Sequence, residues 1–345
     1  MQAPPFLFSF VINQQEMKYS FIIPVYNRPD EVDELLDSLS RQTNKEFEII
    51  IVEDGSQKPC KDVVERYNEK VDVHYYFKEN SGPGDTRNYG VSKANGEYVI
   101  ILDSDCILPE TYLEMVDKSL NEHPCDAFGG PDRAHDSFTY VQKAINYAMT
   151  SFFTTGGIRG GKKQMEKFHP RSFNMGVRRE VYQKLGGFSK MRFGEDIDFS
   201  IRIFKDGYRC LLFQDAWVWH KRRTDFRKFF KQVYNSGIAR INLYKKYPES
   251  LKIVHLLPAV FTIGTLGIIL LSLFCWYTIL LLLLYSMIIF VDSSINNRNV
   301  YVGLISVFAA FIQLIGYGTG FISAFWQRCI LKKDEFSAFN KNFYK

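Results

Sequence analysis

A long apolar stretch in the C-terminal third most restricts what this chain can fold into. Between Ile253 and Val291 the sequence contains no Asp, Glu, Lys or Arg. The stretch is too long for one ordinary membrane span of about 20 residues and about right for two. Val300–Trp326 offers a third span, although Gly316, Gly318 and Gly320 interrupt it. A buried helix of a soluble core is the alternative, but such helices rarely exceed about 20 residues.

The number of spans determines on which side of a membrane the C-terminal end lies. Three spans over residues 251–328 would place Lys332 and Lys333 opposite the N-terminal part of the chain. That arrangement conflicts with the tendency of positive charge to stay on the cytoplasmic side. A re-entrant segment would remove the conflict, and the sequence leaves both arrangements open.

Short apolar runs alternate with helical patterns over the first hundred residues. The runs are typical of buried parallel strands, and the segments between them carry helix-like spacing, as at Val32, Leu35, Leu36 and Leu39. This order predicts an α/β fold with a mainly parallel sheet covered by helices on both faces. The expected strands are Ser20–Val25, Phe47–Val52, Val73–Phe77 and Tyr98–Leu102.

Polar residues follow these strands at the ends where ligands bind in such sheets. Asn27 follows the first strand, Glu53 and Asp54 end the second, and Asp103 and Asp105 follow the fourth. In open parallel sheets, ligands lie at the carboxyl ends of the strands. We therefore expect the chemistry of this protein at that edge.

The segments after the first four strands are less uniform. Residues 133–170 carry little regular pattern, and Thr154–Lys163 is expected to be a mobile loop. Order returns with a strand near Phe173–Val177 and a helix at Glu195–Lys205. Asp225–Tyr247 is an amphipathic, basic helix, which either packs on the domain or lies at a membrane interface.

The pattern divides the chain into five parts. We expect an N-terminal extension (1–18), with Met17 as the true start, and a catalytic domain (19–224). An interfacial helix (225–250), the membrane region (251–328) and a polar tail (329–345) follow.

Charge and cysteine content exclude several classes of protein. The net charge of +5 is modest, and no Arg/Lys stripe with interleaved aromatic residues suggests nucleic-acid binding. The six cysteines are scattered and form no CxxC pair, so neither a zinc site nor a disulfide framework is indicated.

Asp103-Ser104-Asp105 suggests a metal site. Two carboxylates two residues apart at an open strand end can approach one cation. Mg²⁺ and Mn²⁺ take oxygen ligands and share them readily with a diphosphate. The pattern is common in surface loops, and its position after a buried strand gives it weight.

Several ordered motifs together resemble the family 2 glycosyltransferases with the GT-A fold, over about residues 19–225. The resemblance implies an inverting enzyme that uses a UDP- or GDP-linked sugar and Mn²⁺ or Mg²⁺. The motifs are Ser20-Phe21-Ile22-Ile23-Pro24-Val25-Tyr26-Asn27, Val52-Glu53-Asp54-Gly55-Ser56, Arg87-Asn88 with Gly90, Gly96-Glu97-Tyr98, Asp103-Ser104-Asp105, Phe173-Asn174-Met175-Gly176, Gly186-Gly187-Phe188 and Glu195-Asp196-Ile197-Asp198.

The resemblance also implies roles for individual residues near the donor. It assigns Asp105 to the metal, Asp103 to the ribose or the metal, and His220 to the metal or the diphosphate. Glu53 stands where the family often has a first Asp, and its role is therefore left open in favour of Asp54. The residues implied for the nucleotide are Pro24, Tyr26, Asn27, Asp54, Arg87 and Asp103.

The same resemblance implies a general base at Asp196, with Glu195 as an acceptor-binding residue. An acceptor hydroxyl is a poor nucleophile until a carboxylate takes its proton. Favourable charge at a helix start is the structural alternative for both residues. Arg222 and Arg223 either help to hold the leaving diphosphate or face a membrane.

The motif Gln-x-x-Arg-Trp of the family's processive synthases is absent, because Val233-Tyr234-Asn235-Ser236 follows Gln232. We therefore expect transfer of one sugar, to a glycan or lipid-linked acceptor, by a multi-pass protein of the inner or an equivalent membrane with its catalytic domain in the cytoplasm. A polyprenyl-phosphate glycosyltransferase and a non-catalytic membrane scaffold are the alternatives.

Overall fold

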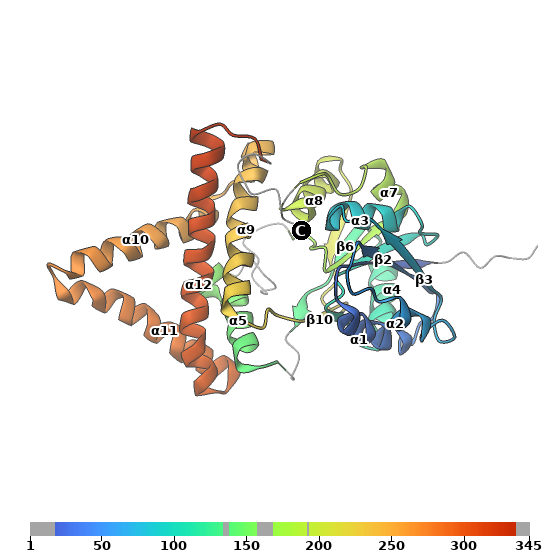
Figure 1. Ribbon diagram of the computed structural model, residues 1–345, viewed down its shortest axis with the longest axis horizontal. Coiled ribbons are helices and arrows are strands. Elements are labelled where there is room, and N and C mark those ends of the chain that lie inside the picture. Colours follow the sequence, from blue (N-terminus) through green and yellow to red (C-terminus); the bar gives the residue numbers. More distant parts are fainter. Residues whose placement is uncertain (1–17, 134–137, 157–167, 192, 336–345) are drawn as a thin grey trace, which may run out of the picture.

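The chain forms an α/β domain and a set of long helices beside it (Figure 1). The computed structural model describes residues 18–133, 138–156, 168–191 and 193–335. The expected N-terminal extension, except Lys18, lies outside these residues, as do most of the loop expected at Thr154–Lys163 and the end of the polar tail.

A seven-stranded sheet, in the order β3-β2-β1-β4-β8-β6-β9, forms the centre of the domain. The strands pair in parallel except β8, which runs antiparallel to both β4 and β6. The α/β prediction with a mainly parallel sheet is therefore confirmed. The strands are β1 (Tyr19–Val25), β2 (Phe47–Asp54), β3 (Val73–Lys78), β4 (Tyr98–Leu102), β6 (Ala127–Gly129), β8 (Asn174–Arg178) and β9 (Cys210–Leu212).

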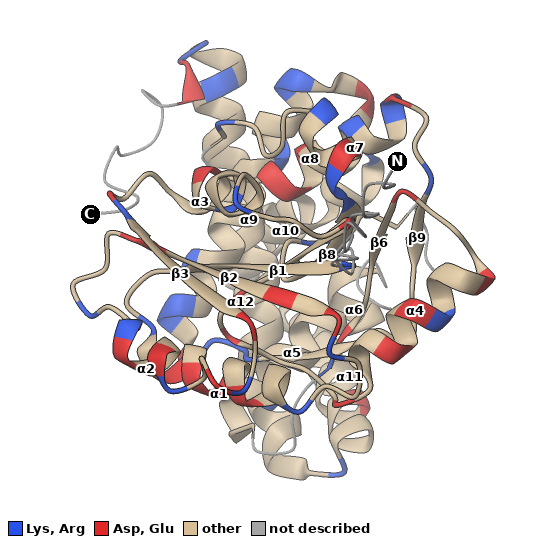
Figure 2. Ribbon diagram, turned by 90° about the vertical axis from the view of Figure 1, so that its right-hand side faces the viewer, with Lys and Arg blue, Asp and Glu red and all other residues tan. Residues whose placement is uncertain are grey.

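Helices cover both faces of this sheet (Figure 2). One buried apolar cluster lies on the side of α1 (Pro29–Ser40), α2 (Lys61–Glu65) and α4 (Tyr112–Glu122). A second lies on the side of α3 (Pro83–Val91), α7 (Arg179–Lys184) and α8 (Glu195–Lys205). Because both faces are covered, the central strands are apolar throughout and fully buried, as β4 shows.

The domain also has a small second sheet, in the order β5-β10-β7. Its pairing brings His220, near the C-terminal end of the domain, next to the segment that follows β4. Its strands are β5 (Cys106–Ile107), β7 (Asp132–Arg133) and β10 (Val218–His220). In the antiparallel pair of β10 and β5, His220 lies opposite Cys106. This pairing places the imidazole beside the loop that follows β4.

The segment expected to be irregular contains two helices, α5 (Tyr140–Thr150) and α6 (Phe152–Thr155). A capping box starts α5: the Thr139 side chain accepts from the Gln142 backbone, and the Gln142 side chain accepts from the Thr139 backbone. The prediction of little regular structure over residues 133–170 was therefore wrong here. The Thr-x-x-Gln sequence is a helix-start signal that could have revealed α5.

Two parallel helices, α9 (Phe226–Lys246) and α12 (Val300–Phe325), stand between the domain and the remaining helices (Figure 1). They approach closely at glycines. A Cβ on Gly320 would lie 2.1 Å from the backbone oxygen of Tyr234, and one on Gly237 would lie 2.2 Å from that of Tyr317.

The expectation that Gly316, Gly318 and Gly320 interrupt the last apolar segment was wrong, because α12 is continuous through all three. These glycines serve close packing against neighbouring helices.

Two further apolar helices, α10 (Leu257–Ser272) and α11 (Leu280–Asn297), form a hairpin that projects away from the domain (Figure 1). By length and composition, Trp276–Asn297 and Val300–Ile330 could each cross a membrane, whereas α10 is shorter. Short helical turns at Pro248–Ser250, Ile253–His255, Trp276–Ile279 and Trp326–Ile330 connect or extend these helices.

Candidate active site

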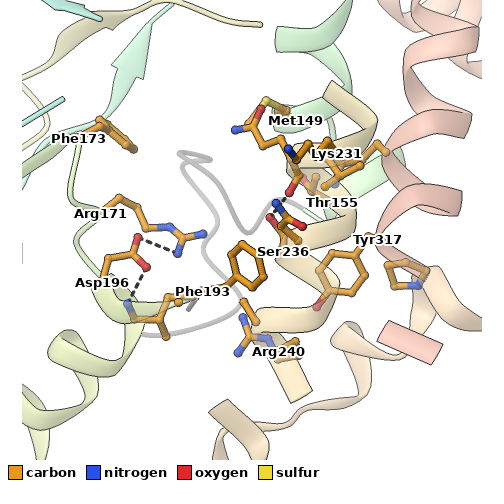
Figure 3. Close-up of a pocket in the computed structure, with 18 of the residues that line it drawn as sticks. Met149, Thr155, Arg171, Phe173, Phe193, Asp196, Lys231, Ser236, Arg240 and Tyr317 are labelled. Carbon is orange, nitrogen blue, oxygen red and sulfur yellow. Dashed lines mark hydrogen bonds and ion pairs between the residues drawn. The ribbon is translucent and has the colours of Figure 1, made fainter. Parts of the chain in front are cut away.

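A cavity of about 620 Å³ lies between the domain and the helices α9 and α12. From the domain it is lined by Asp103, Glu195, Asp196 and His220. Figure 3 shows Asp196 and Arg171 on one side and Lys231, Ser236 and Arg240 of α9 on the other. The cavity thus joins the sheet edge that the sequence indicated to the helices beside the domain.

Arg87 ties two of the predicted site carboxylates together. Its Nη2 donates to Asp103 Oδ1 at 2.9 Å and its Nη1 to Glu195 Oε1 at 3.2 Å. Burial would lower the pKa of Arg87, but Asp103 and Glu195 outweigh that effect and raise it. The guanidinium is therefore a fixed positive charge that holds the end of β4 to the start of α8.

The adjacent carboxylates Glu195 and Asp196 begin α8, directly after Gly194 in the left-handed region (φ 87°). Burial raises the pKa of Glu195, the nearby Asp196 adds to this effect, and Arg87 opposes it. Asp196 Oδ2 accepts from Arg171 Nη1 at 3.2 Å, and its Oδ1 accepts from the Ile197 backbone at 2.8 Å. One carboxylate is thus bound to a buried arginine, and the other to an arginine at the cavity wall.

Asp105 and His220 form a second polar group at the cavity, in which His220 lines the wall and Asp105 lies behind it. Asp105 Oδ1 lies 3.2 Å from His220 Nε2, and its Oδ2 accepts from Arg28 Nη1 at 3.1 Å. Burial would raise the pKa of Asp105, but the charges of His220 and Arg28 outweigh it and lower that pKa well below its ordinary value. The carboxylate is therefore held as an anion.

The donor atoms here fit a divalent cation. Asp105, Cys106 and His220 bring one ligand atom each within 4.8 Å of one another. Among the described residues, His220 Nδ1 is buried without a hydrogen-bond partner, and the contact of Asp105 Oδ1 with His220 Nε2 lacks hydrogen-bond geometry. Burial raises the pKa of the Cys106 thiol well above its ordinary value, so the carboxylate and the imidazole are the better ligands.

The residues expected to hold the nucleotide make their polar contacts within the loops of the same edge. Asn27 Oδ1 accepts from the backbones of Gln57 and Lys58 at 2.8 and 3.0 Å, and its φ is 56°. Asp54 accepts from Ser81 and Gly82 backbones at 2.9 and 3.0 Å and pairs with Lys78 at 2.7 Å.

Glu53, the residue whose role was open, accepts from the Cys60 backbone at 2.8 Å. Pro24 lies in β1, and Tyr26 after it is 37% exposed. Neither these two nor Asn27 and Asp54 line the cavity, so nucleotide binding by all four stays a prediction.

One face of α9 supplies the far wall of the cavity. Lys228, Lys231, Gln232, Asn235, Ser236 and Arg240 recur at helical spacing along this face. Among the described residues, no carboxylate lies within ion-pair distance of Lys231 or Arg240. The wall opposite Asp196 is therefore positively charged.

The two arginines after β10 differ in their surroundings. Arg222 is buried, lies 2.5 Å from Asp132 Oδ2, and donates through Nε to Asn146 Oδ1 at 3.0 Å. These contacts fix α5 to β7 and leave Arg222 little capacity for a ligand. Arg223 lines the cavity, as Arg222 does, and it helps to lower the pKa of Asp105.

Sequence reasoning missed Arg28, Arg171, Cys106 and Asp198. Asp198 is fully buried and accepts from Tyr247 at 2.9 Å, from Ser189 at 2.6 Å and from Lys246. It therefore ties α8 to the end of α9. The third acid of Glu195-Asp196-Ile197-Asp198 was a visible signal for this contact, whereas the arginines carried none, because their partners lie far away in sequence.

The model of a protein family described as glycosyl transferase family 2 matches residues 20–186. An uncharacterized glycosyltransferase of Haemophilus influenzae is 31% identical over 199 residues, which are 54% of this chain and 62% of that protein. An uncharacterized glycosyltransferase of Rickettsia bellii is 34% identical over 109 residues, 32% of this chain and 16% of that protein. The chain therefore spans less than two thirds of either relative.

A solved structure resembles this one over most of its length. It is the mannosyltransferase PcManGT from Pyrobaculum calidifontis, in complex with GDP-Man and Mn²⁺. The TM-score is 0.65 at 16% sequence identity, and the match covers 90% of this chain and 88% of that one. The likeness includes the helices beyond the α/β domain, and it shows a shared fold.

Proposed function

From the match of residues 20–186 to the model of glycosyl transferase family 2, we propose that this chain is a member of that family and that it transfers one sugar from a nucleotide-diphosphate sugar to an acceptor hydroxyl with inversion. One observation carries the proposal: Asp103, Glu195, Asp196 and His220 line a single cavity that also reaches the apolar helices. A glycan or a lipid-linked glycan at a membrane is the acceptor class that this position favours.

The donor would bind at the carboxyl edge of β1, β2 and β4. Asp103 faces the cavity and is fixed by Arg87, so it is placed to meet a ribose or a diphosphate. Arg223 adds positive charge near Asp105, which suits a leaving diphosphate. The structural relative holds GDP-Man, which supports a GDP- or UDP-linked sugar as the donor class.

Asp105 and His220, with Asp103, would hold a Mn²⁺ or Mg²⁺ ion. When bound, such an ion neutralises the charge that develops on the leaving diphosphate. Arg28 would have to release Asp105 Oδ2 for both carboxylate oxygens to become available. Its guanidinium is one-third exposed and already pairs with Glu31, so this exchange needs no repacking of the core.

Asp196 would take the proton of the acceptor hydroxyl. The hydroxyl oxygen forms the new bond to the anomeric carbon, the bond from that carbon to the diphosphate breaks, and the proton passes to a carboxylate oxygen of Asp196. Attack from the side opposite the leaving group inverts the configuration. Arg171 positions Asp196 at the cavity wall, and Glu195, held by Arg87, would orient the acceptor.

A phosphate acceptor is the second candidate, and the cations on α9 favour it. Lys231 and Arg240 stand across the cavity from Asp196 (Figure 3). An acceptor that is itself a lipid phosphate needs less help from a base. Activity that does not change in Asp196→Asn would therefore favour this candidate over a hydroxyl acceptor.

The first test is a panel of nucleotide sugars with Mn²⁺, read as thermal shifts of the purified protein. One donor class should raise the unfolding temperature, and product formation with lipid-linked acceptors should follow for the same donor. If no donor binds by calorimetry, the chain is a non-catalytic scaffold with this fold.

We also propose that the protein attaches to a membrane, with the cell inner membrane or its equivalent as the site and the catalytic domain in the cytoplasm, where nucleotide sugars are made. Support comes from the two helices that are long and apolar enough to cross a bilayer.

A further inference from the structure

The outer half of the α10–α11 hairpin leaves most of its side chains exposed. A Cβ on Gly264 or on Gly267 would meet no atom within 4 Å. At the tip, Leu273 is 77% exposed, Phe274 88% and Trp276 71%. Between His255 and Asp292 the sequence holds no charged residue. Soluble proteins rarely expose so large an apolar surface. The exposed apolar side chains of this hairpin are therefore suited to the hydrocarbon of a bilayer.

The helix α12 crosses the open end of this hairpin and does not run alongside its legs (Figure 1). Gly318 of α12 meets Pro258 and Thr262 at the start of α10. At its other end, Ser306 accepts from Ser293 of α11 at 2.7 Å. The three helices therefore form a triangle, with α12 as its base.

An aromatic cluster fills the triangle near that base. The ring of Phe261 in α10 lies 5.2 Å from that of Tyr285 in α11, and Phe311 of α12 lies 5.6 and 5.7 Å from these two. Between this cluster and α12 the two hairpin helices pack against other helices. From the cluster to the hairpin tip most of their side chains are exposed. This exposed segment, residues 263–284, is the free portion of the hairpin.

The other side of α12 is covered by α9 from end to end. Phe229 and Val233 share an apolar cluster with Val302 at one end, and Arg328 donates to Asn242 at 3.1 Å at the other. The opposite face of α9 carries the cations of the cavity wall. If α12 crossed a bilayer, α9 and its cations would have to enter the hydrocarbon with it, at a cost of about 3 kcal/mol for each charge at the bilayer centre.

The length of the free portion fits half a bilayer. The ten residues of α10 from Ile263 to Ser272 span about 15 Å at 1.5 Å per residue. The hydrocarbon core of a bilayer is about 30 Å thick. The free portion therefore reaches through one leaflet to about the midplane.

We propose that this protein enters the membrane from one side only. Residues 263–284 insert into the near leaflet, α12 lies along the membrane surface, and the described chain on both sides of the hairpin stays with the catalytic domain. The arrangement replaces a multi-pass topology and uses the proposed function only for its membrane attachment. It also puts Lys252, Arg298, Lys332 and Lys333 on the side of the catalytic domain, where they can meet anionic lipid headgroups.

The test uses single cysteines and a membrane-impermeant maleimide on sealed vesicles of both orientations. In a background without the partly exposed Cys210, Cys275 and Cys329, reporters are placed at exposed positions: Asn296→Cys in the last turn of α11, Lys333→Cys after α12, and Phe274→Cys at the tip. Glu69→Cys on the domain surface marks the catalytic side. Thermal unfolding confirms that each variant is folded.

The proposal requires Asn296→Cys and Lys333→Cys to react in the same vesicles as Glu69→Cys, and Phe274→Cys to react only after detergent is added. If α11 and α12 both cross, Asn296→Cys reacts from the opposite side. If α10, α11 and α12 all cross, Lys333→Cys reacts from the opposite side of the membrane. If the hairpin passes through both leaflets, Phe274→Cys reacts from the opposite side. Each of these results overturns the proposal and leaves donor binding, measured separately in detergent, as the test of the enzyme.

Discussion

At the scale of single residues, the two neighbouring carboxylates at the start of α8 differ in their environment. Glu195 pairs with the buried Arg87, and burial raises its pKa. Asp196 pairs with Arg171, which is about one-third exposed at the cavity wall. In the proposed mechanism Asp196 therefore takes the acceptor proton, and Glu195, which lines the same cavity and is held by Arg87, orients the acceptor.

Asp196→Asn should slow the chemical step by on the order of 10²–10⁴-fold, because the amide cannot take the acceptor proton. Donor affinity should barely change, since the base acts on the acceptor. Single-turnover kinetics and donor titration by calorimetry measure the two quantities separately.

Glu195→Gln is the matched control for this variant, and it should weaken acceptor binding more than it slows the chemical step. If Glu195→Gln were inactive and Asp196→Asn active, the two roles would have to be exchanged. Loss of donor binding or of folding in Asp196→Asn would make that residue structural.

Asp105→Ala should abolish turnover, because it removes the anion that His220 and Arg28 surround and that would hold the metal. EDTA should have the same effect on the wild-type protein, and added Mn²⁺ or Mg²⁺ should restore only the wild type. Asp72→Ala is a suitable control, because Asp72 belongs to the other carboxylate–histidine group, on the domain surface. Full activity in EDTA would exclude the assigned metal site.

At the scale of helices, the contact between α9 and α12 depends on the absence of side chains. Gly316 and Gly320 of α12, one turn apart, let α9 approach: Gly316 meets the side chains of Phe230 and Val233, and Gly320 meets the backbone of Tyr234. The same contact places the cations of α9 against the cavity. Packing between these two helices therefore sets the shape of the far cavity wall.

Gly320→Ala should lower the unfolding temperature, because the new methyl group would lie 2.1 Å from the Tyr234 backbone oxygen and push the helices apart. Overpacking of this kind costs about 1–3 kcal/mol. Gly264→Ala adds the same methyl group in α10 where no atom lies within 4 Å, and there alanine should be neutral or stabilising. Differential scanning calorimetry in detergent compares the two, and equal melting would refute the role assigned to Gly320.

Asp198→Asn should destabilise the protein by about 2 kcal/mol at neutral pH, since it weakens hydrogen bonds to a charged group that tie α8 to α9. Although burial would raise the pKa of Asp198, Lys246, Ser189 and Arg202 lower it below its ordinary value of 3.8. The charged form therefore stabilises the fold above that pH, and the contribution is lost as the pH falls through the lower folded-state pKa.

Thermal melts from pH 7 to pH 3 should show the difference between Asp198→Asn and wild type shrinking below about pH 4. Asp215→Asn changes an exposed aspartate and should melt like the wild type at every pH. A difference that stayed constant with pH would mean that Asp198 acts by packing alone.

The elements of the α/β domain were predictable because their signals are local. The predicted strand Tyr98–Leu102 and helix Glu195–Lys205 have the same bounds in the structure. Apolar runs and helix starts are read within a few residues, and the strand order brings Asp103 and Asp105 to one edge.

Contacts between distant segments were not predictable in the same way. Arg87 meets Glu195 and Arg171 meets Asp196 only after folding, so neither pair had a signal in the sequence. The glycines of α12 were read as helix breakers because propensity is local, whereas their function depends on α9, which lies far away along the chain.

At the scale of the whole molecule, membrane attachment should depend on the hairpin tip. Phe274→Asp should release the protein from membranes in carbonate, because a charge in the bilayer interior costs about 2.5–3.5 kcal/mol. Phe77→Asp changes an exposed phenylalanine on the domain, which is 56% exposed, and should leave the protein in the pellet. Sedimentation followed by immunoblotting measures the distribution, and release of the wild type itself would exclude stable insertion.

If α12 lies along the membrane surface as proposed, α9 also sets a distance. Its basic face forms much of the cavity wall, whereas α12 reaches the cavity with Gln313 and Tyr317. A helix with its side chains is about 10–12 Å thick. Most of the cavity would then lie about one helix diameter from the lipid, and the enzyme would favour acceptors whose reacting group stands at that distance from the membrane surface.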